Sequence, residues 1–253
     1  MFPWILLIIT GSALAVLFLR RLRMTRKDLL FQEHLAEEQA EDAAIEAADE
    51  EDGAQTVAET EELLGSIRKA FMKADTHLSR NEFEEAEPLF VAIIQEDPSH
   101  LDAHHKLGLM YMKMGRFGEA ELYFSKLVNL KQDPVYFSNL GAALYQQQRL
   151  IEAAEAYENA IALDDRRGER LQSLGQVYNE LGEDEKALHY FERAARRKPK
   201  DLDLKLILAD YYEKLGRVDE AVEKFKEVLD SDPYNEDVKK RLRLVKKKAG
   251  ELE

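Results

Sequence analysis

The sequence predicts an all-α protein built as a solenoid of stacked helix pairs, and three observations support this prediction. A pattern of apolar and small residues recurs five times, with a period of about 34 residues. Proline closes three of the five copies, where it cannot continue a helix. The chain has only 12 glycines and 6 prolines in 253 residues and is rich in Ala, Glu, Lys and Leu, as all-α proteins are.

The five copies occupy residues 67–100, 101–133, 134–167, 168–201 and 202–235. In the fourth copy the repeated positions hold Leu174, Gly175, Tyr178, Gly182, Ala187, Phe191, Ala194 and Pro199. Most of these positions hold similar residues in the other copies. The departures are few: Gln148 replaces the turn glycine of the third copy, Gln132 and Asp165 replace the closing proline, and the second copy is one residue short.

Each repeated position has a physical reason. Glycine in mid-helix costs about 1 kcal/mol relative to alanine, so Gly108, Gly141 and Gly175 predict a close approach, which we expect against the small alanine of the partner helix. Gly115 and its equivalents follow the first helix of a pair, where a residue with positive φ is favoured. The aromatic position is expected to fill the space between neighbouring helix pairs.

These residues and their spacing resemble the tetratricopeptide repeat family over about two-thirds of the chain. The resemblance implies a right-handed superhelix whose concave face is lined by the first helix of each repeat. At the family's groove positions this chain has Lys106, Leu109, Met112, Lys113, Asn139, Ala142, Tyr145, Gln146, Gln172, Ser173, Gln176 and Asn179. The centre of the groove is therefore expected to be rich in amides and uncharged.

The groove is predicted to bind an extended peptide of a partner protein. Amide side chains both donate and accept hydrogen bonds, so they can pair with a peptide main chain of any sequence. The alternative is an ordinary helix surface wetted by solvent. Some family members hold a C-terminal carboxylate with basic groove residues, but Phe71, Glu169 and Ser173 stand at those positions here, so that mode of binding is not expected.

Residues 1–19 are predicted to be a transmembrane anchor. Phe2 to Leu19 is an uncharged apolar run of 18 residues, about 27 Å long as a helix and close to the thickness of a bilayer core. Arg20, Arg21 and Arg23 follow directly, and the positive-inside rule then predicts an outside N-terminus and repeats in the cytoplasm. A cleaved signal peptide is the alternative, but no Lys or Arg precedes the apolar run.

Residues 20–59 are expected to be a basic juxtamembrane segment followed by an acidic, partly helical linker. The formal net charge of −14 is concentrated there, because 13 Asp and Glu and no Lys or Arg lie between Glu33 and Leu64. This segment is either a solvated spacer between the membrane and the repeats or a docking segment for a basic partner, which could be the basic tail of the same chain.

Residues 236–253 are predicted to form a basic capping helix and tail. Val238, Leu242 and Val245 have helical spacing and suit the covering of the last repeat, as solenoids require. The other faces carry Lys239, Lys240, Arg241, Arg243, Lys246, Lys247 and Lys248. Three alternatives remain for these basic side chains: they form a solvated surface, they contact anionic lipid or nucleic acid, or they bind the acidic linker of the same chain. The absence of aromatic residues among them disfavours nucleic-acid binding by stacking.

The sequence predicts no enzyme, no cofactor and no metal site. It lacks the glycine-rich phosphate-binding motifs, the serine-hydrolase elbow and the helical zinc motif. Cysteine is absent, which excludes disulfides, iron–sulfur clusters and thiolate zinc sites. His100 and His104 have the four-residue spacing of a helical metal pair, but His100 falls in a loop and no third ligand is evident beside His105.

Together these patterns predict a membrane-anchored, cytoplasm-facing scaffold with a monomeric repeat domain, which binds partner peptides in its concave groove. The alternative is a membrane-tethered assembly factor whose basic C-terminal helix contacts anionic lipid or nucleic acid.

Overall fold

A computed structural model describes residues 60–248 and 250 of the chain. The chain divides into two compact units, Met1–Ser66 and Ile67–Glu253. The predicted membrane anchor (residues 1–19) and the predicted basic juxtamembrane segment and acidic linker (residues 20–59) lie outside the described residues. Among the residues that are described, no helix has both the length and the apolar character needed to cross a membrane.

The second unit consists of helices and short connections throughout its described part, which confirms the all-α prediction. Residues 60–79 are helical, and residues 67–79 are the part of this helix that belongs to the second unit. The helices that follow are α2 (Phe83–Glu96), α3 (Leu101–Lys113), α4 (Phe117–Leu130), α5 (Pro134–Gln146), α6 (Leu150–Leu163), α7 (Gly168–Glu180), α8 (Asp184–Arg197), α9 (Leu202–Lys214), α10 (Val218–Ser231) and α11 (Glu236–Lys248).

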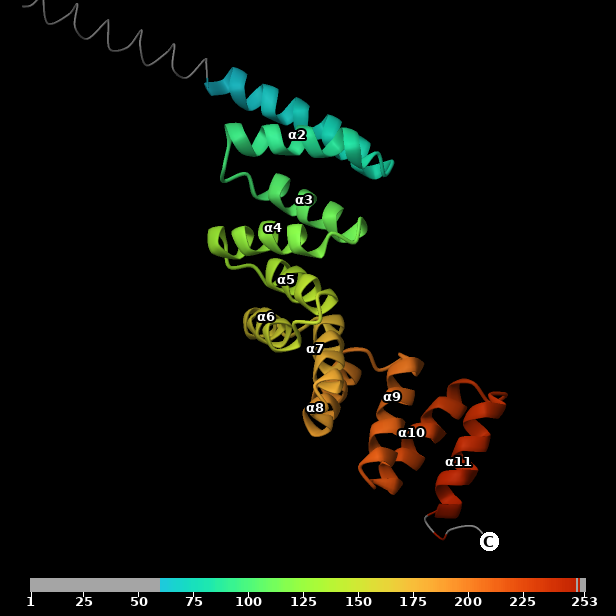
Figure 1. The fold of residues 1–253 in the computed structure, drawn as a ribbon. Helices are drawn as coiled ribbons and strands as arrows, with labels where there is room; N and C mark the ends of the chain where they lie inside the picture. The colour runs from blue at the N-terminus through green and yellow to red at the C-terminus, as the bar shows by residue number, and fades with distance from the viewer. Residues whose placement is uncertain (1–59, 249, 251–253) are drawn as a thin grey trace, which may run out of the picture. The chain divides into compact units, whose positions relative to one another are not determined.

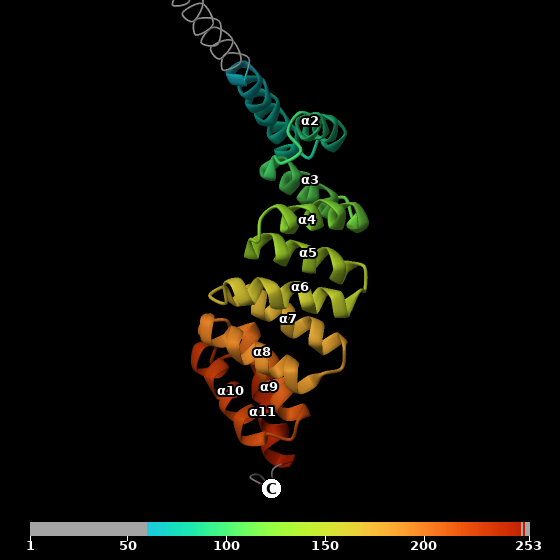
Figure 2. The same cartoon turned by 90° about the vertical axis from the view of Figure 1, so that its left-hand side faces the viewer.

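Each helix packs mainly against its neighbours in sequence, so the helices form a solenoid (Figures 1 and 2). The pairs α3–α4, α5–α6, α7–α8 and α9–α10 lie within the predicted second to fifth repeats. Helix α11 packs on α10 and buries Val238 and Val245. The first helices of successive repeats, α3, α5, α7 and α9, therefore follow one another along the solenoid.

The core is built around the repeated aromatic position. Phe90, Phe124, Phe191 and Phe225 are almost completely buried. The prediction for the mid-helix glycines was wrong about their partner, because each faces an aromatic ring of its own repeat and not an alanine. A Cβ atom built on Gly108 would lie 2.5 Å from the Phe124 ring, and one on Gly175 would lie 2.9 Å from the Phe191 ring. The glycine is needed because the ring occupies the space of a side chain.

The turns between the two helices of a repeat share one backbone conformation. Gly115, Gly182 and Gly216 have φ of 72°, 76° and 74°. Gln148 keeps this geometry without a glycine, at φ 61°, and Asn81 does so at φ 57°. The replacement of glycine therefore leaves the turn unchanged and places a strained residue in it, since side chains other than Asn rarely adopt this region.

Replacing Gln148 with glycine is expected to raise the free energy of unfolding by about 0.5–1 kcal/mol. A left-handed conformation costs an ordinary residue about 1–2 kcal/mol, and the greater chain entropy of glycine offsets part of the gain. The measurement is urea denaturation followed by circular dichroism. Asn81→Gly is the matched control and should change stability less, because asparagine tolerates this region. A loss at position 148, or a larger gain at position 81, would contradict the expectation.

A second recurring contact joins three of the first helices, α3, α7 and α9, to the preceding repeat. The Tyr111 hydroxyl donates to Glu87 at 2.5 Å, and the Tyr178 hydroxyl donates to Glu158 at 2.5 Å. Tyr212 repeats the contact with Glu192 at 2.8 Å. Burial and the adjacent carboxylate raise the pKa of all three tyrosines. These hydrogen bonds link α3, α7 and α9 to the second helix of the preceding repeat.

Candidate protein-binding surface

The predicted groove residues lie on a face where the first helices of successive repeats contact one another. Lys106 Nζ lies 2.6 Å from a carboxylate oxygen of Asp75 in the preceding repeat. In the same way, Asn139 Nδ2 of α5 lies 2.8 Å from His105 Nε2 of α3. Side chains from the first helices of neighbouring repeats therefore meet on this face, and we call this series of contacts the inner face.

The amides of the inner face are already engaged with other side chains. Gln172 Oε1 accepts a hydrogen bond from Lys198 Nζ at 3.5 Å, and Gln176 Nε2 donates to Glu180 at 3.3 Å. Asn179 Oδ1 accepts from the Tyr211 hydroxyl at 2.5 Å. Only part of each amide is therefore free for a ligand, in contrast to the fully available amides that the sequence suggested. Within the described residues, the carbonyl oxygen of Gln176 and the amino group of Asn179 make no hydrogen bond.

A cleft of about 290 Å³ opens on this face between α7 and α9, and we call it the inner cleft. It is lined by Gln176, Asn179, Phe191, Ile207, Asp210, Tyr211 and Lys214. The structure thus places two predicted groove residues, Gln176 and Asn179, beside the core residue Phe191 and one side of α9. The cleft offers apolar surface from the half-buried Ile207, next to the buried Phe191 ring, beside polar groups from both helices.

The other predicted groove residues lie outside the inner cleft. Leu109 and Met112 of α3 are partly buried against the core, and Lys113 is exposed at the end of that helix. On α5, Tyr145 reaches across to α7 and donates its hydroxyl to Glu180, while Gln146 is exposed. These residues can contribute to one binding surface only along the inner face, since they do not surround a common cavity.

The inner face is not uncharged at its centre, so that part of the prediction was wrong. Glu180 accepts hydrogen bonds from Tyr145 and Gln176, and no cation of the described residues pairs with it. In contrast, Asp210 pairs with Arg241 of α11, and Lys214 Nζ lies 2.6 Å from Asp184. Because the other two charges are compensated, Glu180 leaves a net negative charge beside the cleft.

Two tyrosines of this region are shifted toward their protonated form. The hydrogen bond to Glu180, together with burial, raises the pKa of Tyr145. Burial and the nearby Asp184 raise the pKa of Tyr211 to about 12. The raised pKa extends to higher pH the range in which these hydroxyls donate hydrogen bonds to Glu180 and Asn179.

Sequence reasoning missed the contribution of α9 to the cleft. Ile207, Asp210 and Lys214 stand 34 residues after Ser173, Gln176 and Glu180. Extending the groove positions by one more repeat would have found all three. Tyr211 is different, because its hydroxyl reaches Asn179 from a position that the groove pattern does not include.

The three neighbouring histidines have separate structural partners. His100 caps α3 by accepting a hydrogen bond from the Ala103 amide at 3.2 Å. His104 is buried, with Nε2 at 3.0 Å from the Pro98 carbonyl, and His105 contacts Asn139. In the described part of the chain, no three His, Asp or Glu side chains gather closely enough to hold a metal ion.

Comparison with protein families decides the classification. Models described as tetratricopeptide repeat match residues 77–144, 134–167 and 173–236. The chain belongs to the tetratricopeptide repeat family. Proteins of this family bind protein or peptide partners, and their repeats are typically non-enzymatic scaffolds.

Solved structures with the same fold include MamA and YrrB. The MamA protein is 26% identical with a TM-score of 0.62, and the match covers 67% of this chain and 95% of MamA. YrrB is 22% identical with a TM-score of 0.57, and the match covers 71% of this chain and 90% of YrrB. At that identity the likeness to YrrB shows the fold alone.

Curated relatives match over the repeats only in part. Mouse protein O-mannosyl-transferase TMTC1 is 30% identical over 154 residues, which is 59% of this chain and 16% of that protein. The 131 kDa subunit of yeast transcription factor tau is 24% identical over 175 residues, 69% of this chain and again 16% of that protein. The chain thus spans about one-sixth of either relative, and the activities in their names do not transfer with the repeats.

Proposed function

We propose that this protein is a scaffold that binds an extended segment of a partner protein along its inner face, with the inner cleft as the main contact. The observation that supports this proposal most directly is the cleft itself. It places the half-buried Ile207 side chain beside two amides, Gln176 and Asn179, and one polar group of each amide makes no hydrogen bond to the described residues. An apolar floor with a few placed polar groups is the usual form of a ligand site.

The chemistry of the cleft defines the segment that it fits. One apolar side chain of the partner would lie against Ile207. The Gln176 carbonyl and the Asn179 amino group would pair with the main chain, since amides bond to either of its polar groups. Glu180 lacks a cationic partner among the described residues, so a lysine or arginine next to the apolar residue would add a favourable charge contact.

We also propose that residues 2–19 anchor the scaffold in a membrane, with the repeats in the cytoplasm. The apolar run and the arginines that follow it support this arrangement. Such an anchor would hold the inner face near the membrane, where a bound partner would be concentrated.

Removing two contacts of the inner cleft is expected to weaken peptide binding by about tenfold or more. Peptides selected from a displayed random library against the full chain in lipid nanodiscs serve as the probe, and fluorescence anisotropy measures the dissociation constant. The Gln176→Ala/Ile207→Ala variant loses a hydrogen bond worth about 0.5–1.5 kcal/mol and part of an apolar contact. Leu122→Ala, at an exposed residue of α4, is the control and should bind normally.

The basic helix α11 supports a second candidate function, attachment to an anionic surface such as lipid. Lys239, Arg241 and Lys248 are paired with carboxylates, but Lys240, Arg243, Lys246 and Lys247 have no such partner in the described part of the chain. Binding through these residues would weaken steeply with added salt. The selected peptides distinguish the two candidates. If Gln176→Ala/Ile207→Ala binds them normally while Lys240→Glu/Arg243→Glu/Lys247→Glu abolishes their binding, α11 is the binding surface and the inner-cleft proposal is wrong.

A further inference from the structure

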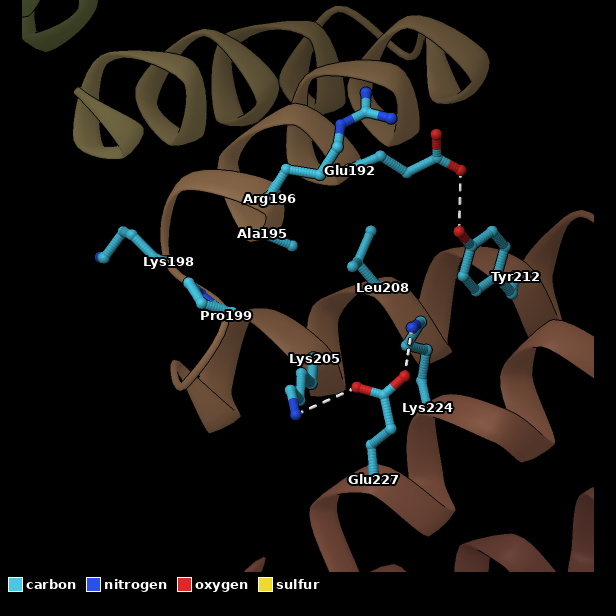
Figure 3. Close-up of a pocket in the computed structure, with 10 residues that line it drawn as sticks. All are labelled: Glu192, Ala195, Arg196, Lys198, Pro199, Lys205, Leu208, Tyr212, Lys224 and Glu227. Atoms are coloured by element: carbon cyan, nitrogen blue, oxygen red, sulfur yellow. Dashed lines mark hydrogen bonds and ion pairs between the residues drawn. The ribbon is translucent and has the colours of Figure 1, made fainter. Parts of the chain in front are cut away.

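A second cleft, of about 450 Å³, lies between α8, α9 and α10, and we call it the outer cleft (Figure 3). Its lining residues are Glu192, Ala195, Arg196, Lys198, Pro199, Lys205, Leu208, Tyr212, Lys224 and Glu227. None of them lines the inner cleft. The outer cleft combines a patch of apolar surface with an unusual density of cations.

One residue that lines the outer cleft, Lys205, departs from the repeat pattern. Lys205 stands 34 residues after Leu171 and 68 after Phe137, so the fifth repeat places a lysine where the two before it have apolar side chains. Leu171 is completely buried in the core. An ammonium group cannot be buried in that way without a large desolvation cost, so Lys205 must reach a partner or water. Its side chain is 17% exposed and lines the cleft.

Two lysines share one carboxylate at one side of the outer cleft (Figure 3). Glu227 lies 3.0 Å from Lys205 Nζ and also contacts Lys224 Nζ. Burial opposes the charge of Glu227, but the two lysines outweigh it and lower the pKa of this carboxyl group. The arrangement shows that the two ammonium groups converge on a position suited to a carboxylate.

The remaining charges leave the outer cleft positive. The second carboxylate of the lining, Glu192, accepts a hydrogen bond from the Tyr212 hydroxyl at 2.8 Å and faces Arg217 outside the cleft. Arg196 is exposed and has no carboxylate partner among the described residues, whereas Lys198 pairs with Asp201 at 2.9 Å. Among the residues that the structure describes, both carboxylates of the lining are thus already bonded, and Arg196, Lys205 and Lys224 retain unused donors.

We propose that the outer cleft is a second docking site, which binds an acidic side chain of a partner protein together with a neighbouring apolar side chain. Lys205 and Lys224 hold the carboxylate, beside or in place of Glu227, and Arg196 adds positive charge nearby. The apolar side chain lies against Leu208, Ala195 and Pro199. A protein segment fits better than a free inorganic anion, because 450 Å³ far exceeds one carboxylate or phosphate and such an ion would leave the apolar wall uncovered.

The experiment measures binding of a fluorescein-labelled peptide of alternating glutamate and leucine to the full chain in lipid nanodiscs at low ionic strength. Lys205→Met and Lys224→Met are each expected to weaken binding by about tenfold. Each single variant leaves the other lysine paired with Glu227. Methionine also restores an apolar side chain at position 205, so the thermal midpoint of Lys205→Met should stay constant or rise. If Lys205 only stabilised the fold, Lys205→Met would instead lower the thermal midpoint and leave peptide binding unchanged.

Matched controls separate this site from general charge attraction and from the inner cleft. Lys226→Met removes an exposed lysine of α10 that does not line the cleft, and it should bind normally. Gln176→Ala/Ile207→Ala should also bind this peptide normally. The proposal fails if Lys226→Met weakens binding as much as Lys205→Met, if the glutamine version of the peptide binds equally well, or if inorganic phosphate displaces the peptide at equal concentration.

Discussion

Replacing Phe124 with alanine is expected to lower the free energy of unfolding by about 3–5 kcal/mol. The side chain is completely buried in the core of the second repeat, where its ring lies against Gly108 and 6.3 Å from the His105 ring. Alanine would leave a cavity, and Gly108 of α3 has no side chain that could move to fill it. Urea denaturation followed by circular dichroism measures the loss.

The matched control for Phe124→Ala is Leu122→Ala on the same helix. Leu122 is 68% exposed, so its truncation should change stability by no more than about 0.5 kcal/mol. In a solenoid each repeat contacts only its neighbours, so hydrogen exchange in Phe124→Ala should accelerate most in α3 and α4. Equal losses in the two variants, or exchange that accelerates evenly in all repeats, would show that the aromatic position does not hold its own repeat together.

The helix pairs and their turns could be predicted from the sequence because local rules determine them. A helix begins and ends where the 34-residue pattern places its glycine and proline, and the structure follows this pattern even at Gln148, which takes the positive φ of the glycines it replaces. The neighbouring helices then determine the turn more strongly than the residue inside it does. This explains why a departure from the repeat pattern need not signal a departure in structure.

The partners of individual side chains could not be predicted in the same way. The sequence suggested that Asn179 faces a ligand with its whole amide, but its Oδ1 accepts a hydrogen bond from the Tyr211 hydroxyl of the next repeat. Such a contact depends on the rotamers of two residues 32 positions apart, and the repeat pattern describes only their backbones. The aromatic ring over Gly108 is a similar case, because the sequence indicates a close approach there without identifying the group that approaches.

Two departures from the repeat pattern, at Gln148 and Lys205, differ in what they indicate about function. Gln148 changes a turn residue and leaves the surface as it was, whereas Lys205 changes a position next to the core and is accompanied by a charged cleft. The sequence contains this second signal, since Leu171 and Lys205 are one repeat apart. Its meaning depends on Lys224 and Glu227 of α10, which only the folded structure brings to the same place.

Replacing Gly108 with leucine is expected to lower the free energy of unfolding by about 3 kcal/mol, at the upper end of the usual cost of overpacking. The first side-chain carbon alone would lie 2.5 Å from the buried Phe124 ring. Gly118→Leu is the matched control, because no atom lies within 4 Å of a Cβ atom there and a better helix former replaces glycine; stability should stay constant or rise by up to about 1 kcal/mol.

The double variant Gly108→Leu/Phe124→Ala tests whether the glycine and the ring compete for one space. Alanine at position 124 vacates the volume that the leucine needs, so the double variant should lose less stability than the sum of the two single losses, by about 1–3 kcal/mol. Chemical denaturation of the wild type and the three variants completes the cycle. Strict additivity would mean that the leucine does not enter the space of the ring and that Gly108 is required for another reason.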